Sequence, residues 1–190
     1  DERDWYMKLD DADLEGLPDF LIQAAKNAGQ DKGIDAAIIT TSRSLIVPFL
    51  QCSPRRDLRE RAKRAWDKRG ANGGEYDNLK IAQEILSLRQ ERAELLGYAN
   101  FAEFKLETEM AKTPETVRKF LMDVWEPAKR AAEKDAKILS DLLHADGFNG
   151  ALQTWDWRYY AEQRRKSEYD LDEAEIKPYF ELSQMINASF

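Results

Sequence analysis

The clearest hydrophobic pattern in the chain runs from Thr113 to His144. Apolar side chains recur there at spacings of three and four residues, and charged side chains fill the other positions. Thr113 is a suitable N-cap, Pro114 stands where a helix tolerates proline, and Gly147 follows just past the end. The pattern predicts one long amphipathic helix with one buried and one solvated face. Its apolar positions are Val117, Phe120, Leu121, Val124, Trp125, Ala128, Ala131, Ala132, Leu139, Leu142 and Leu143.

Three further segments have the same spacing and predict helices: Pro18–Asn27, Arg55–Arg69 and Asn78–Leu96. Gly97 predicts a left-handed stop for the last of them. Asn100 and Glu103 form a capping-box pattern ahead of a short helix, and Asp170 with Glu173 repeats that pattern near the C-terminus.

Two short segments complete the fold prediction. Ala36–Thr40 is rich in β-branched residues and is a candidate strand. The residues from Trp5 to Leu9 are interpreted instead as the beginning of a helix. We therefore expect a mostly α protein with at most a minor β element near Ala36–Thr40, and residues 1–190 as a single helical unit.

Composition narrows the function classes. Lys and Arg total 29 against 36 Asp and Glu, so the formal charge of −7 disfavours general binding to nucleic acid or anionic lipid. The longest apolar stretches are too short to span a bilayer, and Cys52, the single cysteine, has no intrachain disulfide partner. We expect a cytoplasmic protein with neither a nucleic-acid nor a membrane partner.

Two clusters have competing interpretations. The Arg- and Lys-rich segment Arg55–Arg69 could follow a phosphate backbone, but the favoured interpretation is a solvated helix face with Leu58, Ala62, Ala65 and Trp66 buried. The aromatic residues Trp155, Trp157, Tyr159 and Tyr160 begin a helix that we expect Thr154 to cap. They could line a peptide-binding cleft, although packing in the core is the default expectation.

Catalytic chemistry is hard to build from this chain. A His-Glu-x-x-His zinc site needs two histidines on one helix face, and His144 is the only histidine. Asp141 and His144 resemble half of a metal-binding pair, but a surface histidine near a helix end is the expected role. A Cys52–His144 nucleophile pair has no support in the sequence. We expect no catalytic and no metal-binding residue here.

Several runs resemble one family of zinc peptidases. The longest are Thr154–Glu162 (Thr-Trp-Asp-Trp-Arg-Tyr-Tyr-Ala-Glu) and Tyr169–Phe180 (Tyr-Asp-Leu-Asp-Glu-Ala-Glu-Ile-Lys-Pro-Tyr-Phe). Leu86–Arg89, Leu95–Phe101, Met110–Glu115, Ser44–Leu50 and Gly16–Leu21 add to the resemblance in the same order. These runs are similar to the zinc oligopeptidases related to thimet oligopeptidase, oligopeptidase A and bacterial peptidyl-dipeptidase.

The resemblance implies a larger, helical, two-lobed enzyme that uses one zinc ion to cut short peptides inside a channel. The family's zinc-binding motif lies further along the chain, so we expect an internal fragment that forms part of one wall and is inactive alone. On this basis Trp157, Tyr160 and Tyr169 are candidates for lining the channel. We also expect self-association through exposed ends, at Trp5, Tyr6, Met7 and Leu9 and at Met185, Ile186 and Phe190. The alternative function is a stand-alone helical protein-interaction domain.

Overall fold

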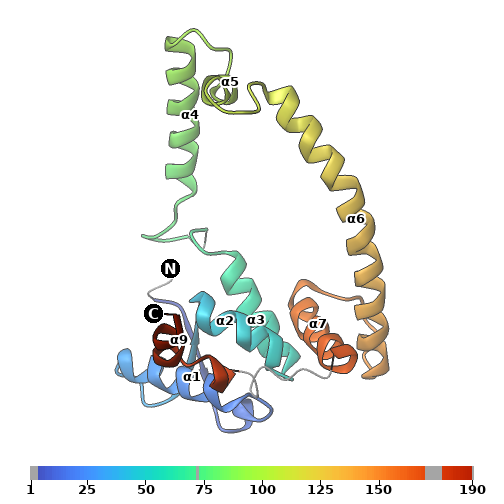
Figure 1. Cartoon of the computed structure of the whole chain (residues 1–190). Coiled ribbons are helices and arrows are strands. Elements are labelled where there is room, and N and C mark those ends of the chain that lie inside the picture. The colour runs from blue at the N-terminus through green and yellow to red at the C-terminus, as the bar shows by residue number, and fades with distance from the viewer. Residues whose placement is uncertain (1–3, 72, 170–176, 190) are drawn as a thin grey trace. The chain divides into compact units, whose positions relative to one another are not determined.

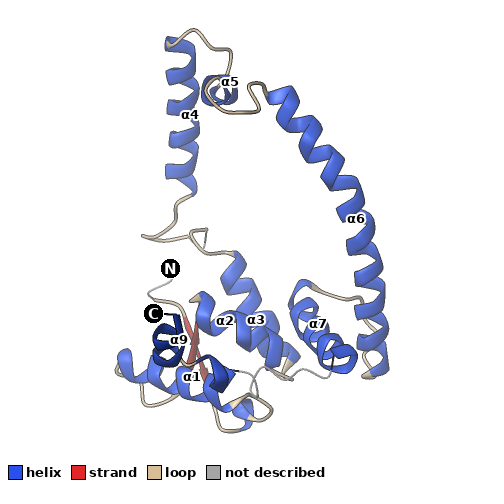
Figure 2. Ribbon diagram, in the orientation of Figure 1, coloured by secondary structure: helices blue, strands red, loops and turns tan. Residues whose placement is uncertain are grey.

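A computed structural model describes residues 4–71, 73–169 and 177–189. The chain divides into two compact units: residues 70–137, and residues 4–69 together with 138–189. Figure 1 follows the elements along the chain, and Figure 2 marks them as helix, strand or loop. The expectation that residues 1–190 act as one helical unit stays a prediction.

The N-terminal segment is a β-strand, so the expected helix near Trp5 is wrong. β1 (Tyr6–Leu9) pairs antiparallel with β2 (Ala37–Thr40), with Tyr6 opposite Thr40 and Leu9 opposite Ala37. Met7 and Leu9 are buried while Tyr6 and Lys8 are exposed, which is the two-residue alternation of a strand with one buried face. The exposure expected of Met7 and Leu9 is therefore also wrong. The strand predicted at Ala36–Thr40 is confirmed.

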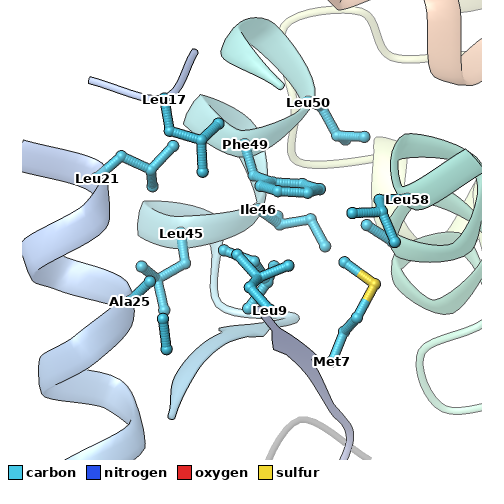
Figure 3. Close-up of a cluster of buried hydrophobic side chains, with 13 residues drawn as sticks. Met7, Leu9, Leu17, Leu21, Ala25, Leu45, Ile46, Phe49, Leu50 and Leu58 are labelled. Atoms are coloured by element: carbon cyan, nitrogen blue, oxygen red, sulfur yellow. The ribbon is translucent and has the colours of Figure 1, made fainter. Parts of the chain in front are cut away.

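Three helices build the main core around this pair of strands: α1 (Asp19–Asp31), α2 (Arg43–Cys52) and α3 (Arg56–Asp67). Figure 3 shows Leu9 of β1 directed toward Ile46 of α2, and Met7 of β1 directed toward Ile46 and Leu58. Leu17, Leu21, Ala25, Leu50 and Leu58 complete the labelled cluster. Because aliphatic and aromatic burial dominates folding free energy, this cluster stabilises the unit.

Helix α1 approaches the segment before β2 at Gly29. A Cβ at this position would lie 2.0 Å from the carbonyl oxygen of Ala36 and 3.0 Å from that of Ile34. Only a residue without a side chain permits this approach, which brings α1 against β2.

The same unit includes the 3-10 turns η1 (Ala12–Leu14) and η2 (Lys177–Phe180) and the helices α7 (Thr154–Tyr169) and α9 (Leu182–Ser189). α7 packs against α2 and α3. Its Tyr160 joins Leu139 and Leu143 in a second buried cluster. The capping pattern expected at Asp170 and Glu173 falls outside the described residues.

In the other unit, α4 (Leu79–Leu95) and α5 (Phe101–Leu106) pack together. The Asn100 side chain accepts the N–H of Glu103 at 3.0 Å, which confirms the cap of α5. Gly97 has a φ of 84°, and the N–H of Tyr98 reaches the carbonyl of Ala93 at 2.9 Å, so the predicted left-handed stop of α4 is confirmed.

Helix α6 (Pro114–Ala145) confirms the longest predicted element, and its 32 residues extend about 48 Å at 1.5 Å per residue. Thr113 Oγ1 accepts the N–H of Thr116 at 3.2 Å, and Gly147 follows with a φ of 85°. The expected continuous burial of its apolar face is wrong. Leu139 and Leu143 are buried, but residues 120–132 are exposed, because the described helices leave that part of the face uncovered.

The observed class is mostly α with one two-stranded sheet, as predicted. Across the described ranges, no helix combines the length and apolar character that crossing a bilayer requires.

Candidate functional site

Asp156, in the first turn of α7, has a fully buried carboxylate that is held by two arginines. Its side chain is 0% exposed. Arg56 donates from Nε to Oδ1 at 2.9 Å and from Nη2 to Oδ2 at 2.8 Å, which is the two-pronged geometry that suits guanidinium and carboxylate. Arg59 donates from Nη2 to Oδ1 at 3.2 Å. Two arginines of α3 therefore hold one buried carboxylate of α7.

Arg59 is as deeply buried as Asp156, with a side chain only 1% exposed. Its remaining N–H groups donate to backbone carbonyls: Nη1 to Ser53 at 2.8 Å and to Pro54 at 3.1 Å, and Nε to Trp155 at 3.2 Å. Such full satisfaction is what a buried charge requires. The interpretation of Arg55–Arg69 as a solvated basic face is therefore wrong at Arg59.

Asp156 also starts helix α7. Its Oδ2 accepts the N–H of Gln153 at 3.1 Å, so a carboxylate satisfies a donor at the helix start and complements its positive end. Thr154, expected as the cap, lies instead within the first turn of the helix. The Asp156 side chain thus caps the N-terminal end of α7 and also ties this helix to α3.

Aromatic rings surround these guanidinium groups. Arg56 lies 4.0 Å from the centroid of the Phe148 ring and 5.6 Å from that of Trp155, and Arg59 lies 4.1 Å from that of Tyr159. Contacts of a guanidinium with a ring face add attraction and shield the charge from water. The guanidinium group of Arg64 also lies over the ring of Trp155, 5.0 Å from its centroid.

The three candidate channel residues differ in exposure along α7. Tyr160 is 5% exposed, within the cluster of Leu139 and Leu143, and contacts Tyr159 edge-on at 5.1 Å. Trp157 is 37% exposed and Tyr169 is 65% exposed. Nine residues at 100° per residue place Tyr160 and Tyr169 on opposite sides of α7. Tyr160 is therefore a core residue, while Trp157 and Tyr169 are accessible, and their role in a channel stays a prediction.

The environment of Tyr160 also changes its acidity. Burial, together with a hydrogen bond to Asp146, raises the pKa of the Tyr160 hydroxyl to about 12. The phenol is thus neutral throughout the physiological pH range, as a packing residue should be.

His144 and the acidic side chains of the described residues were the candidates for a metal site. His144 is exposed in the last turn of α6, as expected for a surface histidine. Within residues 4–71, 73–169 and 177–189, no three His, Cys, Asp or Glu side chains come together as a possible metal site. A zinc site needs three or four such ligands, so the described residues do not fit the zinc that the family resemblance implies.

Sequence reasoning missed the Arg56–Asp156–Arg59 cluster, although a signal was present. Arg59 lies between Leu58 and Ala62 on the apolar stripe of its helix, where a solvated arginine is out of place. Asp156 stands in the middle of the Trp-Asp-Trp run. The pairing itself links residues 97 positions apart, which helical periodicity cannot predict.

Comparison with known proteins shows which protein family this chain is similar to. The profile described as peptidase family M3 matches residues 49–189, which include α3, α6 and α7. The chain is 34% identical over 185 residues to oligopeptidase A of Escherichia coli, covering 95% of this chain and 27% of that protein. It is 31% identical to dipeptidyl carboxypeptidase of E. coli, covering 94% of this chain and 26% of that protein.

A plant relative matches this chain to a similar extent. The probable cytosolic oligopeptidase A of Arabidopsis thaliana is 35% identical over 191 residues, covering 95% of this chain and 27% of the relative. The chain thus spans about a quarter of the length of these curated relatives, and it belongs to peptidase family M3.

Proposed function

We propose that this chain is part of a zinc metallopeptidase of family M3 that hydrolyses short peptides inside a channel, and that it contributes a wall without catalytic residues. The family match over residues 49–189 carries the proposal. The names oligopeptidase A and dipeptidyl carboxypeptidase support peptides as the substrate class.

The zinc ion belongs, in this proposal, to residues outside this chain. Zinc in such peptidases polarises the scissile carbonyl and activates water, and it needs a histidine-rich ligand set. His144 alone cannot provide that set. The proposed contribution of this chain is therefore structural: Arg56, Arg59 and Asp156 fix the start of α7, from which Trp157 and Tyr169 would face the substrate.

Three further proposals concern the partners and the location of the protein. Several basic residues of the segment Arg55–Arg69 pair with nearby carboxylates, Arg55 with Asp13 and Asp57 and Arg64 with Glu60, which supports a protein without affinity for nucleic acid. A cytoplasmic location is proposed, supported by the A. thaliana relative, which is named probable cytosolic oligopeptidase A. Self-association of the chain is proposed through α9, where Met185 and Ile186 are exposed.

A stand-alone interaction domain is the second candidate function. It is favoured by the exposed apolar face of α6, since amphipathic helices commonly dock partner helices. The family match outweighs it, because a profile covering residues 49–189 specifies peptidase ancestry and not merely a helical shape.

A fluorescence-quenched peptide assay tests the proposal. Residues 1–190, purified and supplied with zinc, should give no turnover above buffer and no zinc binding that survives dialysis. The full-length peptidase should cleave the same peptide and lose that activity with a chelator. Metal-dependent turnover by residues 1–190 that disappears in His144→Ala would overturn the assignment.

A further inference from the structure

The same spacing of apolar residues occurs twice along α6. The side chains are exposed in the first occurrence and largely buried in the second. Leu121, Val124 and Trp125 recur 18 residues later as Leu139, Leu142 and Leu143. Because 18 residues are five full turns of an α-helix, the two sets occupy the same face. Leu139 and Leu143 are buried in the cluster with Tyr160, whereas Leu121, Val124 and Trp125 are each more than half exposed.

A groove lies beside the bare half of this face, within the unit of residues 70–137. It has a volume of about 350 Å³ and lies between α5 and α6. Its lining is mainly apolar: Ala102, Leu106, Pro114, Val117, Arg118, Leu121 and Met122. Phe120, 67% exposed, extends the apolar surface next to the groove. Monomeric proteins rarely leave a continuous apolar surface of this kind on one helix uncovered.

The occupant is best matched by another helix of the same parent peptidase. The buried half of the α6 face packs on helix α7, so the repeated spacing suits helix packing along its whole length. The chain corresponds to only 27% of the length of its relatives, which leaves most of a family M3 sequence to supply such a helix. Arg118, the charged residue among those that line the groove, would complement an acidic residue of that helix.

We infer that Leu121, Val124 and Trp125, with the groove between α5 and α6, form the docking surface for an amphipathic helix from the part of the parent peptidase outside residues 1–190. This inference rests on the proposed function, in that the parent is a longer peptidase of family M3. The docked helix packs its apolar stripe on this surface and removes Trp125 from water.

The inference is tested in the full-length peptidase by comparing how fast a maleimide modifies cysteines placed on the two faces of α6. Val124→Cys lies on the inferred surface, and its neighbour Asp123→Cys lies on the polar face beside Lys119 and serves as the matched control. We expect a maleimide to modify Cys at 124 about 100-fold more slowly than Cys at 123, as measured by mass spectrometry of the labelled peptide. In residues 1–190 alone, at micromolar concentration, the two rates should agree within about threefold.

Other outcomes decide the inference as clearly. Equal rates at both positions in the full-length peptidase would overturn it. Protection of Cys at 124 in residues 1–190 alone, growing with concentration and with a doubled mass, would overturn it in favour of a second copy. If Val124→Cys misfolds, Phe120→Cys and hydrogen exchange of residues 117–125 in the unmodified protein replace it. Protection at 124 in a parent that hydrolyses no peptide supports this surface and overturns the proposed function alone.

Discussion

Arg59 Nη2 lies 3.2 Å from Oδ1 of Asp156, and both side chains are almost wholly buried although 97 positions separate them in sequence. The pair joins α3 to α7 through charges that water does not reach. The position of α7, and of the accessible Trp157 on it, therefore depends on Arg56 and Arg59 of α3.

Asp156→Asn should destabilise the chain by about 3–5 kcal/mol, because removing one member of a buried ion pair leaves the other charge uncompensated. Arg59 would keep its backbone acceptors but lose its counter-charge. Urea denaturation monitored by tryptophan fluorescence measures the change. The control is Asp123→Asn, which breaks the exposed pair with Lys119 and should cost less than about 0.5 kcal/mol. Equal effects of the two substitutions would contradict the buried cluster.

Tyr160 makes stability depend on pH in the alkaline range. Its folded-state pKa of about 12 exceeds the value near 10 of an unfolded tyrosine, so the folded chain retains a proton that the unfolded chain has lost. This stabilising contribution is complete below pH 10 and declines as the pH rises from 10 to 12. Denaturation midpoints across this range should fall more steeply for the natural chain than for Tyr160→Phe. Parallel curves would show that Tyr160 titrates normally.

Gly29→Ala tests the approach of α1 to the chain before β2. The added Cβ would lie 2.0 Å from the carbonyl oxygen of Ala36, so the backbone has to move, at a cost of about 1–3 kcal/mol or more. Gln30→Ala, at an exposed position of the same helix, should change stability by less than about 0.5 kcal/mol. Thermal unfolding compares them, and an unchanged midpoint for Gly29→Ala would mean that the approach is looser than described.

Self-association through α9 is expected to weaken in Met185→Ser. Met185 is exposed on a short helix with Ile186, and hiding such side chains favours association. Light scattering at high protein concentration should give a smaller mean mass for this variant than for the matched control Gln184→Ser. A natural chain that stays strictly monomeric would contradict the expectation.

The helix boundaries were predictable because local chemistry determines them. Thr113 and Gly147 bracket α6, and Asn100 starts α5, through hydrogen bonds to backbone groups a few residues away. Such signals are present in the sequence itself. β1 was missed because four residues carry little periodic information and its pairing with β2 is a contact between distant segments.

Periodicity along α6 correctly located an apolar face but could not say what covers it. The buried and the bare halves of that face have the same spacing, and only the structure distinguishes Leu139 from Leu121. The burial of Arg59 was equally invisible, because its partner Asp156 comes from a different helix. In each case the missing information was a tertiary contact.

We propose that this chain contributes part of a wall and no catalytic residue to a family M3 peptidase, and His144→Ala in the full-length enzyme is the decisive test of that proposal. His144 is the only histidine here, so any zinc ligand or proton donor of that type within residues 1–190 must be this side chain. Zinc content, by mass spectrometry, and kcat/KM on a quenched peptide should both remain within about twofold of the natural enzyme. Loss of the metal, or a fall in kcat/KM of about 100-fold or more with the fold intact, would show that His144 takes part in zinc binding or catalysis.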